Sequence, residues 1–232
     1  MRVFLLALSL LFIYGCNSSS DQVEKVSIDQ KESPEKSSST ASTNRKVILF
    51  FGNSLTAGYG VDPDERFTAL IQEKLDSLDY SYEVINAGVS GETTASGSSR
   101  LDWVIKQQEV EVFVLELGAN DGLRGIPTEE TRKNLVEMIE KVRNKNASTD
   151  ILLTGMMVPP NMGPDYSDAF TRIFPEVAKQ KNVSFMPFLL QDVAGESELN
   201  LEDGIHPNKK GHQIVAENLW PYLEPLLQDS DS

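Results

Sequence analysis

Short apolar runs alternate along the chain with longer segments in which apolar residues recur every three or four positions. The short runs are rich in β-branched and aromatic residues, which is typical of β-strands, and several are apolar on both faces, as in a buried parallel sheet. Five runs have this pattern: Val47–Phe51, Tyr82–Asn86, Val110–Leu117, Ile151–Met156 and Val183–Met186.

The longer segments predict amphipathic helices with one apolar stripe each. The stripes consist of Phe67, Leu70, Ile71, Leu75 and Leu78 in one helix and Leu135, Met138, Ile139 and Val142 in another. A last helix is expected from about Lys210 to Leu227, with a kink at Pro221. The alternation predicts an α/β fold, a three-layer, doubly wound, five-stranded parallel sheet with functional groups in loops beyond the carboxyl ends of the strands.

The first residues have a different pattern. Arg2 is followed by an almost unbroken apolar run, Val3–Ile13, which is too short to span a bilayer, and Gly15 precedes the only cysteine, Cys16. Residues 1–15 therefore resemble a bacterial lipoprotein signal peptide, whose cleavage would leave Cys16 as a lipidated N-terminus. The alternative is an ordinary secretory signal in which the cysteine has no role.

Residues 16–45 contain many Ser, Thr, Lys, Glu and Asp residues and almost no large apolar side chains. Such a segment buries too little apolar surface to offset its chain entropy, so we expect a disordered tether. The folded domain is expected over residues 46–228, with 229–232 as a short tail. Lipidation at Cys16 would anchor the domain to a membrane of the cell envelope, facing the periplasm or the cell surface.

The composition restricts the classes of partner and chemistry. Of 232 residues, 21 are Lys or Arg and 35 are Asp or Glu, which gives a net charge of -14. Because nucleic-acid binding relies on clustered Lys and Arg, this balance argues against a nucleic-acid partner. A single cysteine excludes an intramolecular disulfide and a Cys-based metal site. We expect neither a metal nor an organic cofactor.

A mechanism that needs an imidazole has two candidates, since the chain contains only two histidines. Asp203 lies three residues before His206 in a turn with Gly and Pro, which would let the carboxylate hold Nδ1–H while Nε2 faces outward as a base. His212 has no such partner nearby in the sequence. It falls in the first turn of the last helix, where a surface or capping role is expected.

A serine becomes a strong nucleophile when a base takes its proton, and its attack on an acyl carbon creates an oxyanion that needs N–H donors. Ser54 follows the first predicted strand, Gly91 the second and Asn120 the third, so these residues can meet His206 at one edge of the sheet. Each also has an ordinary alternative, respectively as a helix cap, a turn glycine and an Asx-turn residue.

Together, four segments resemble the SGNH (GDSL) hydrolase family, which carries Ser, Gly, Asn and His in this order. They are Gly52-Asn53-Ser54-Leu55, Gly91, Gly118-Ala119-Asn120-Asp121 and Asp203-x-x-His206. The resemblance covers nearly all of residues 46–228 and implies a flavodoxin-like SGNH hydrolase fold. It also implies a catalytic triad formed by Ser54, His206 and Asp203. It further implies an oxyanion hole formed by the N–H groups of Ser54 and Gly91 and by the side-chain amide of Asn120.

The resemblance assigns supporting roles in these loops to Asn53 and Asp121. Asn53 stands where the family usually has Asp, and this position is not part of the triad. An amide can accept the same hydrogen bonds as a carboxylate but carries no negative charge. We therefore expect the Asn53→Asp variant to remain active, with a changed rate or stability.

The sequences around Asn120 and His206 are similar to those of a bacterial periplasmic subgroup of acyl-CoA thioesterases, lysophospholipases and arylesterases. This similarity implies a serine esterase that acts on a small-molecule or lipid ester through an acyl-enzyme. In that subgroup the loop after the fourth strand flanks the acyl site. The corresponding candidates for contact with an acyl chain are Met157, Pro159, Met162 and Phe170; their alternative is an ordinary place in the core.

Two other functions fit the same sequence. A carbohydrate O-acetyl esterase of the same family would keep the triad but would have a shallow polar groove instead of a deep apolar pocket. A non-catalytic surface lipoprotein that binds a glycan or a lipid would have no activated hydroxyl at Ser54. The size of the pocket distinguishes the carbohydrate esterase from an esterase of longer acyl chains. Labelling by a fluorophosphonate distinguishes the non-catalytic binding protein from either enzyme.

Overall fold

The computed structural model describes residues 45–227. The predicted signal peptide, the lipidation site at Cys16, the tether up to Asn44 and the C-terminal tail lie outside the described residues. Five strands form one parallel sheet: β1 (Lys46–Gly52), β2 (Tyr82–Gly88), β3 (Val110–Glu116), β4 (Asp150–Thr154) and β5 (Ser184–Met186). Their order is β2-β1-β3-β4-β5, which is the flavodoxin-like order and confirms the predicted fold class.

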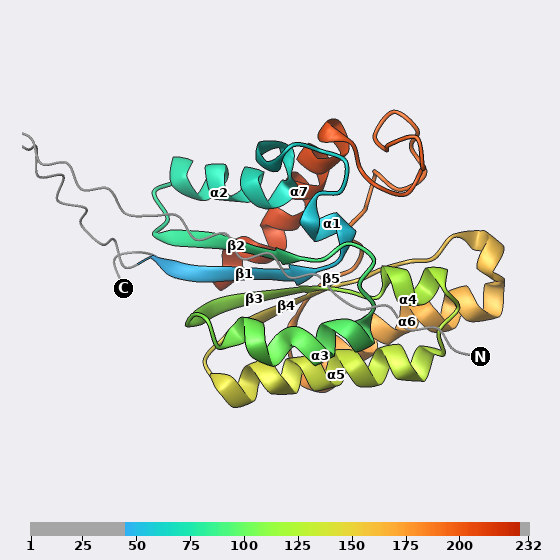
Figure 1. The fold of residues 1–232 in the computed structure, drawn as a ribbon, viewed down its shortest axis with the longest axis horizontal. Coiled ribbons are helices and arrows are strands. Elements are labelled where there is room, and N and C mark those ends of the chain that lie inside the picture. Colours follow the sequence, from blue (N-terminus) through green and yellow to red (C-terminus); the bar gives the residue numbers. More distant parts are fainter. Residues whose placement is uncertain (1–44, 228–232) are drawn as a thin grey trace, which may run out of the picture. The chain divides into compact units, whose positions relative to one another are not determined.

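Helices cover both faces of the sheet (Figure 1). One face carries α2 (Phe67–Ser77) and α7 (Lys209–Leu223), and the other carries α3 (Thr94–Ile105), α5 (Thr128–Lys145) and α6 (Pro164–Lys181). Two short helices, α1 (Ser54–Ala57) and α4 (Ala119–Leu123), directly follow the central strands. Three 3-10 turns are η1 (Pro63–Glu65), η2 (Pro160–Met162) and η3 (Glu224–Leu226). Each helix within residues 45–227 is too short or too polar to cross a membrane.

The hydrophobic pattern of the strands has a direct structural cause. β1 and β3 lie in the middle of the sheet between two helical layers, so residues 48–51 and 112–115 are almost completely buried on both faces. Fully burying a large apolar side chain stabilises the fold by roughly 1.5–3 kcal/mol. β2 lies at an edge and has a mixed pattern of exposed and buried residues.

The ends of the first three strands are aligned, because Gly52 of β1 is in register with both Gly88 of β2 and Glu116 of β3. The chain then turns tightly into α1. A Cβ atom at Gly52 would lie 2.1 Å from Oγ1 of Thr56, and one at Gly88 would lie 2.2 Å from the backbone nitrogen of Ala57. Only glycine therefore lets this turn pack against the end of the sheet.

Candidate active site

Ser54 is placed by the tight turn that joins β1 to α1. It is the first residue of α1, and the side chain of Asn53 caps this helix by accepting the N–H of Leu55 at 3.0 Å. Gly58 ends the helix after one turn in a left-handed conformation. Because a residue at the start of a helix has no intrahelical acceptor for its N–H, the N–H of Ser54 is available for another partner.

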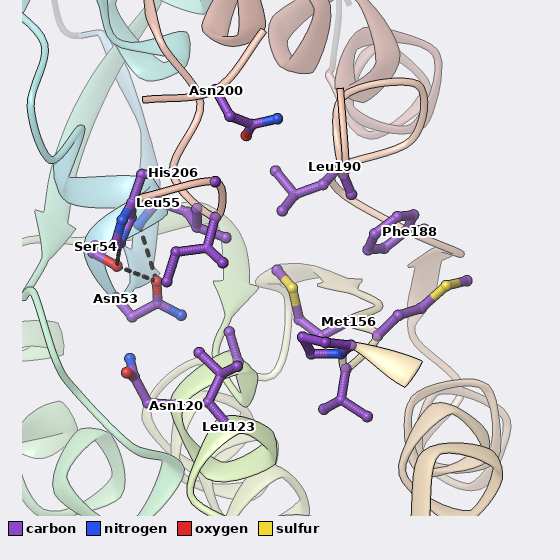
Figure 2. A pocket seen from close by; sticks show the side chains of 18 residues that line it. Asn53, Ser54, Leu55, Asn120, Leu123, Met156, Phe188, Leu190, Asn200 and His206 are labelled. Atoms are coloured by element: carbon purple, nitrogen blue, oxygen red, sulfur yellow. Dashed lines mark hydrogen bonds between the residues drawn. The ribbon is translucent and has the colours of Figure 1, made fainter. Parts of the chain in front are cut away.

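Ser54, His206 and Asp203 form a continuous hydrogen-bonded chain, of which Figure 2 shows the contact between Ser54 and His206. The Oγ of Ser54 lies 2.8 Å from Nε2 of His206, and Nδ1 of His206 lies 2.7 Å from Oδ2 of Asp203. The other carboxylate oxygen of Asp203 accepts the N–H groups of Ile205 and His206, each at 3.0 Å. The carboxylate thus folds back onto the imidazole as the Asp-x-x-His spacing predicts.

The charge state of Asp203 suits this contact. Partial burial acts to raise its pKa, but hydrogen bonds from the N–H of Ile205 and from His206 outweigh burial and hold the pKa below its ordinary value. The ionised carboxylate can therefore orient the imidazole and stabilise its protonated form.

Tyr59 is a neighbour of the imidazole that the sequence analysis does not identify. Its ring centroid lies 4.7 Å from that of His206, and its N–H donates to the carbonyl of Ser54 at 3.0 Å. The ring is half exposed and restricts the imidazole on one side. Nothing in the order of residues distinguishes Tyr59 from a solvent-exposed aromatic residue of a loop.

The predicted oxyanion donors come from the loops after β2 and β3. Asn120 lies in α4, lines the same cavity as Ser54, and donates one amide hydrogen to the carbonyl of Glu92 at 3.0 Å, which leaves its second hydrogen for another acceptor. Gly91 has a left-handed φ of 79°, and its carbonyl accepts from Arg124 at 3.0 Å. Within residues 45–227, no hydrogen bond uses the N–H of Gly91.

The two predicted supporting residues are both fully buried. Asp121 accepts the N–H of Thr94 at 2.9 Å and also the hydroxyl groups of Thr94 and Thr131, so it ties α4 to the starts of α3 and α5. Asn53 acts as an acceptor toward Leu55, as expected, but it also donates its amide to Glu116 at 2.7 Å. Glu116 could not be singled out from the sequence, because it is the last residue of a mostly apolar strand.

Of the two roles expected for His212, surface or capping, the surface role is wrong because the side chain is buried. It is 1% exposed, and its ring stacks on Phe67 with centroids 5.9 Å apart. Its Nδ1 accepts the N–H of Phe67, which is the first residue of α2, so His212 caps a helix distant in sequence. Burial and, less strongly, the charge of Arg66 lower its pKa to about 4. His212 is therefore a neutral structural group.

A cavity of about 590 Å³ opens beside Ser54. Figure 2 shows Ser54 and His206 on one side and Met156, Phe188 and Leu190 across from them. Most of its wall is apolar, which suits a ligand with a hydrocarbon part. Its apolar side chains include Leu123, Met156, Met157, Pro159, Phe188 and Leu190.

The cavity corrects part of the predicted acyl site. Met157 and Pro159 line it, whereas Met162 and Phe170 do not. Phe170 is fully buried in the core between α6 and α4, with its ring edge against Phe174, because it fills the space that Gly122 leaves in α4. The loop after β5 supplies another wall of the cavity, with Phe188 and Leu190, and its lack of a periodic pattern makes this wall unpredictable from the sequence.

Residues 45–227 contain no group of three or more His, Cys, Asp or Glu side chains that could hold a metal ion. The groups that meet at the carboxyl ends of the strands are a serine hydroxyl, an imidazole and a carboxylate, joined by hydrogen bonds. This arrangement on a doubly wound parallel sheet defines the protein as a serine hydrolase.

Comparison with known proteins assigns the chain to a particular family. The model of the GDSL-like lipase/acylhydrolase family matches residues 50–214, and the chain belongs to this family. Esterase TesA of Pseudomonas aeruginosa is 39% identical over 182 residues, which cover 78% of this chain and 90% of that protein. Thioesterase 1/protease 1/lysophospholipase L1 of Escherichia coli K12 is 34% identical over 181 residues, 78% of this chain and 85% of that protein.

A solved structure also supports the assignment to this family. The crystal structure of the psychrotrophic esterase EstA from Pseudoalteromonas, inhibited by monoethylphosphonate, is similar to this chain with a TM-score of 0.74 and 35% sequence identity. The similarity covers 78% of this chain and 97% of that one. The fold and the family predicted from the four segments are therefore confirmed.

Proposed function

We propose that the protein is an esterase that hydrolyses carboxylic esters and thioesters of acyl chains, with Ser54, His206 and Asp203 as its catalytic triad. The observation that carries this proposal is the 2.8 Å contact between the Ser54 hydroxyl and the His206 imidazole beside a largely apolar cavity. The esterase and thioesterase/lysophospholipase relatives support the same class of substrate.

In the first half of the reaction, Nε2 of His206 takes the proton of Ser54 while Oγ attacks the carbonyl carbon of the ester. Asp203 orients the imidazole and stabilises the imidazolium. The oxyanion that forms is held by the N–H groups of Ser54 and Gly91 and by the free amide hydrogen of Asn120. Each such donor contributes about 3 kcal/mol of transition-state stabilisation.

In the second half, the alcohol or thiol leaves with the proton from His206, and the acyl group remains on Ser54. Water then enters, loses a proton to His206 and attacks the acyl carbon, which releases the acid and restores the serine. The acyl chain occupies the cavity between the loop after β4 and the loop after β5. Met157 and Pro159 contact it from the first loop, and Phe188 and Leu190 from the second.

The apolar wall favours an acyl chain over the acetyl group of a carbohydrate ester. An acetyl group needs little of a 590 Å³ cavity, and a sugar needs polar partners, which few of the lining residues offer. The contact of Ser54 with an imidazole likewise argues against a non-catalytic binding protein, because such a protein needs no activated hydroxyl.

We also propose that residues 1–15 are a lipoprotein signal peptide, that Cys16 is lipidated, and that residues 16–45 tether the domain of residues 46–228 to a membrane of the cell envelope, with 229–232 as a tail. The support is the short apolar run before the single cysteine and the polar composition after it.

A chain-length series tests the substrate class. Turnover would be measured on p-nitrophenyl esters from acetyl to palmitoyl, on a lysophospholipid and on an acyl-CoA. We expect kcat/KM to rise from acetyl to longer chains, because each buried methylene contributes about 0.8 kcal/mol. The variant Ala194→Trp, which fills the cavity, should lose this preference and keep acetyl-ester hydrolysis, whereas Met162→Ala, outside the cavity, should behave as the wild type. A maximum at acetyl together with hydrolysis of acetylated sugars would favour the carbohydrate esterase.

A further inference from the structure

A buried carboxylate lies directly beneath the nucleophile turn, and the proposed reaction does not use it. Glu116 is the last residue of β3 and is 1% exposed. It lies in register with Gly52, where β1 ends and the turn begins. A carboxylate is costly to bury, so its hydrogen-bond partners must account for its presence.

Among residues 45–227, the side chain of Glu116 accepts hydrogen bonds only from the turn that carries Ser54. Oε1 accepts the side-chain amide of Asn53 at 2.7 Å. Oε2 accepts the N–H of Asn53 at 3.1 Å, the N–H of Thr56 at 3.3 Å and the hydroxyl of Thr56 at 2.8 Å. The carboxylate therefore holds the residues immediately before and shortly after Ser54.

The turn is shaped around this carboxylate. A Cβ atom at Gly52 would lie 2.4 Å from Oε2 of Glu116, so a side chain there would displace the carboxylate. The donors from Asn53 and Thr56 are uncharged, and desolvation raises the pKa of Glu116 to about 7 although their hydrogen bonds oppose this effect. The hydrogen bonds between Glu116 and the turn therefore depend on which groups of the turn face the carboxylate.

The direction of each hydrogen bond at Asn53 is fixed. Its Oδ1 accepts the N–H of Leu55 at 3.0 Å and lies 3.4 Å from the hydroxyl of Ser54, so its Nδ2 must face Glu116. An aspartate at position 53 would bring two carboxylates into contact, and one of them would have to take a proton or move. An asparagine satisfies both neighbours at once.

From this geometry we propose that Asn53 and Glu116 form a matched donor–acceptor pair that fixes the nucleophile turn, with Glu116 as a positioning residue for Ser54. The pair makes the group that is suitable at residue 53 dependent on the group at residue 116. The proposal rests on the proposed function of Ser54 as the nucleophile.

A double-mutant cycle tests the pair. In Asn53→Asp two carboxylates face each other. In Glu116→Gln an amide N–H₂ must face at least one donor of the turn. In the double variant, the nitrogen of the introduced glutamine can donate to the introduced aspartate, and the glutamine oxygen can keep the other three donors. The aspartate can still accept the N–H of Leu55, so every hydrogen bond has a partner again.

We expect each single variant to lose about tenfold in kcat on a p-nitrophenyl ester with little change in KM, and the double variant to recover to within a few-fold of the wild type. A purely structural loss would not be rescued in this way. Thr149→Val serves as a matched control. The Thr149 side chain makes one buried hydrogen bond just before β4, at the amino-terminal end of the strands and so far from the nucleophile turn. This control should lower thermal stability and leave kcat unchanged.

The proposal is overturned if the single variants keep the wild-type kcat, or if the double variant loses the product of the two single losses. If Glu116→Gln does not fold, Thr56→Val tests the same oxygen, and an unchanged kcat in that variant also overturns the proposal. A wild-type protein without esterase activity would contradict the proposed function instead. The pair would then be tested by whether the unfolding temperatures of the same four proteins are non-additive.

Discussion

The hydroxyl of Ser54 lies between two hydrogen-bond acceptors. On one side is the Nε2 of His206, at 2.8 Å, and on the other is the Oδ1 of Asn53, at 3.4 Å. The closer partner is the base, so the geometry favours proton transfer to the imidazole. His206 and His212 have different roles, since His206 faces the cavity with Nδ1 against Asp203, whereas His212 is buried with Nδ1 against the N–H of Phe67.

The stability of the fold at acid pH should depend on His212. Its pKa is about 4 in the folded state against an ordinary value of 6.5, so the unfolded chain binds a proton over this range that the folded chain does not. This group therefore lowers the free energy of unfolding as pH falls from 6.5 to 4, by up to about 3 kcal/mol. Asn at this position can still accept the N–H of Phe67 but cannot titrate.

Urea unfolding of the wild type and of His212→Asn at several pH values measures this effect. The loss of stability between pH 6.5 and pH 4 should be smaller in the variant. Glu116, whose raised pKa acts in the opposite direction between 4.5 and 7, contributes equally to both proteins and cancels in the difference. Parallel stability curves for the two proteins would show that His212 does not titrate as described.

Among the secondary-structure elements, the sequence predicts best those whose apolar residues follow a regular pattern. The strands are identifiable because burial on both faces requires apolar residues at almost every position, and α5 because one stripe faces the sheet. The helices α3 and α6 are not predicted individually. α3 is rich in Ser, Thr and Gly, which obscures its apolar period. α6 has a regular apolar stripe, Phe170, Ile173, Phe174, Val177 and Ala178, but it starts at Pro164 and contains Pro175, and proline argues against a helix interior.

The active site likewise contains residues that the sequence could predict and residues that it could not. Ser54, Asn120 and the Asp203–His206 turn could be predicted because strand ends in a parallel sheet meet at one edge. Glu116 could not, because a single polar residue at the end of a buried strand is also consistent with solvent exposure there. The wall formed by Phe188 and Leu190 depends on how an irregular loop folds back over the edge of the sheet.

At the scale of the whole molecule, the proposed anchor and the catalytic domain are separate units of the sequence. With a net charge of -14, the protein should gain little from electrostatic contact with anionic lipid, so membrane association should depend on acyl chains at Cys16. The full-length Cys16→Ser variant should appear in the soluble fraction with wild-type esterase activity. Retention of that variant in the membrane fraction would show that another segment anchors the protein.

The central claim is that the Ser54 hydroxyl is the activated nucleophile. The most direct measurement is covalent labelling by a fluorophosphonate, with the modified residue located by mass spectrometry and p-nitrophenyl ester hydrolysis followed in parallel. We expect one adduct on Ser54, loss of hydrolysis as the adduct forms, and neither labelling nor hydrolysis in folded Ser54→Ala. An adduct on a different residue, or wild-type turnover by Ser54→Ala, would contradict this claim.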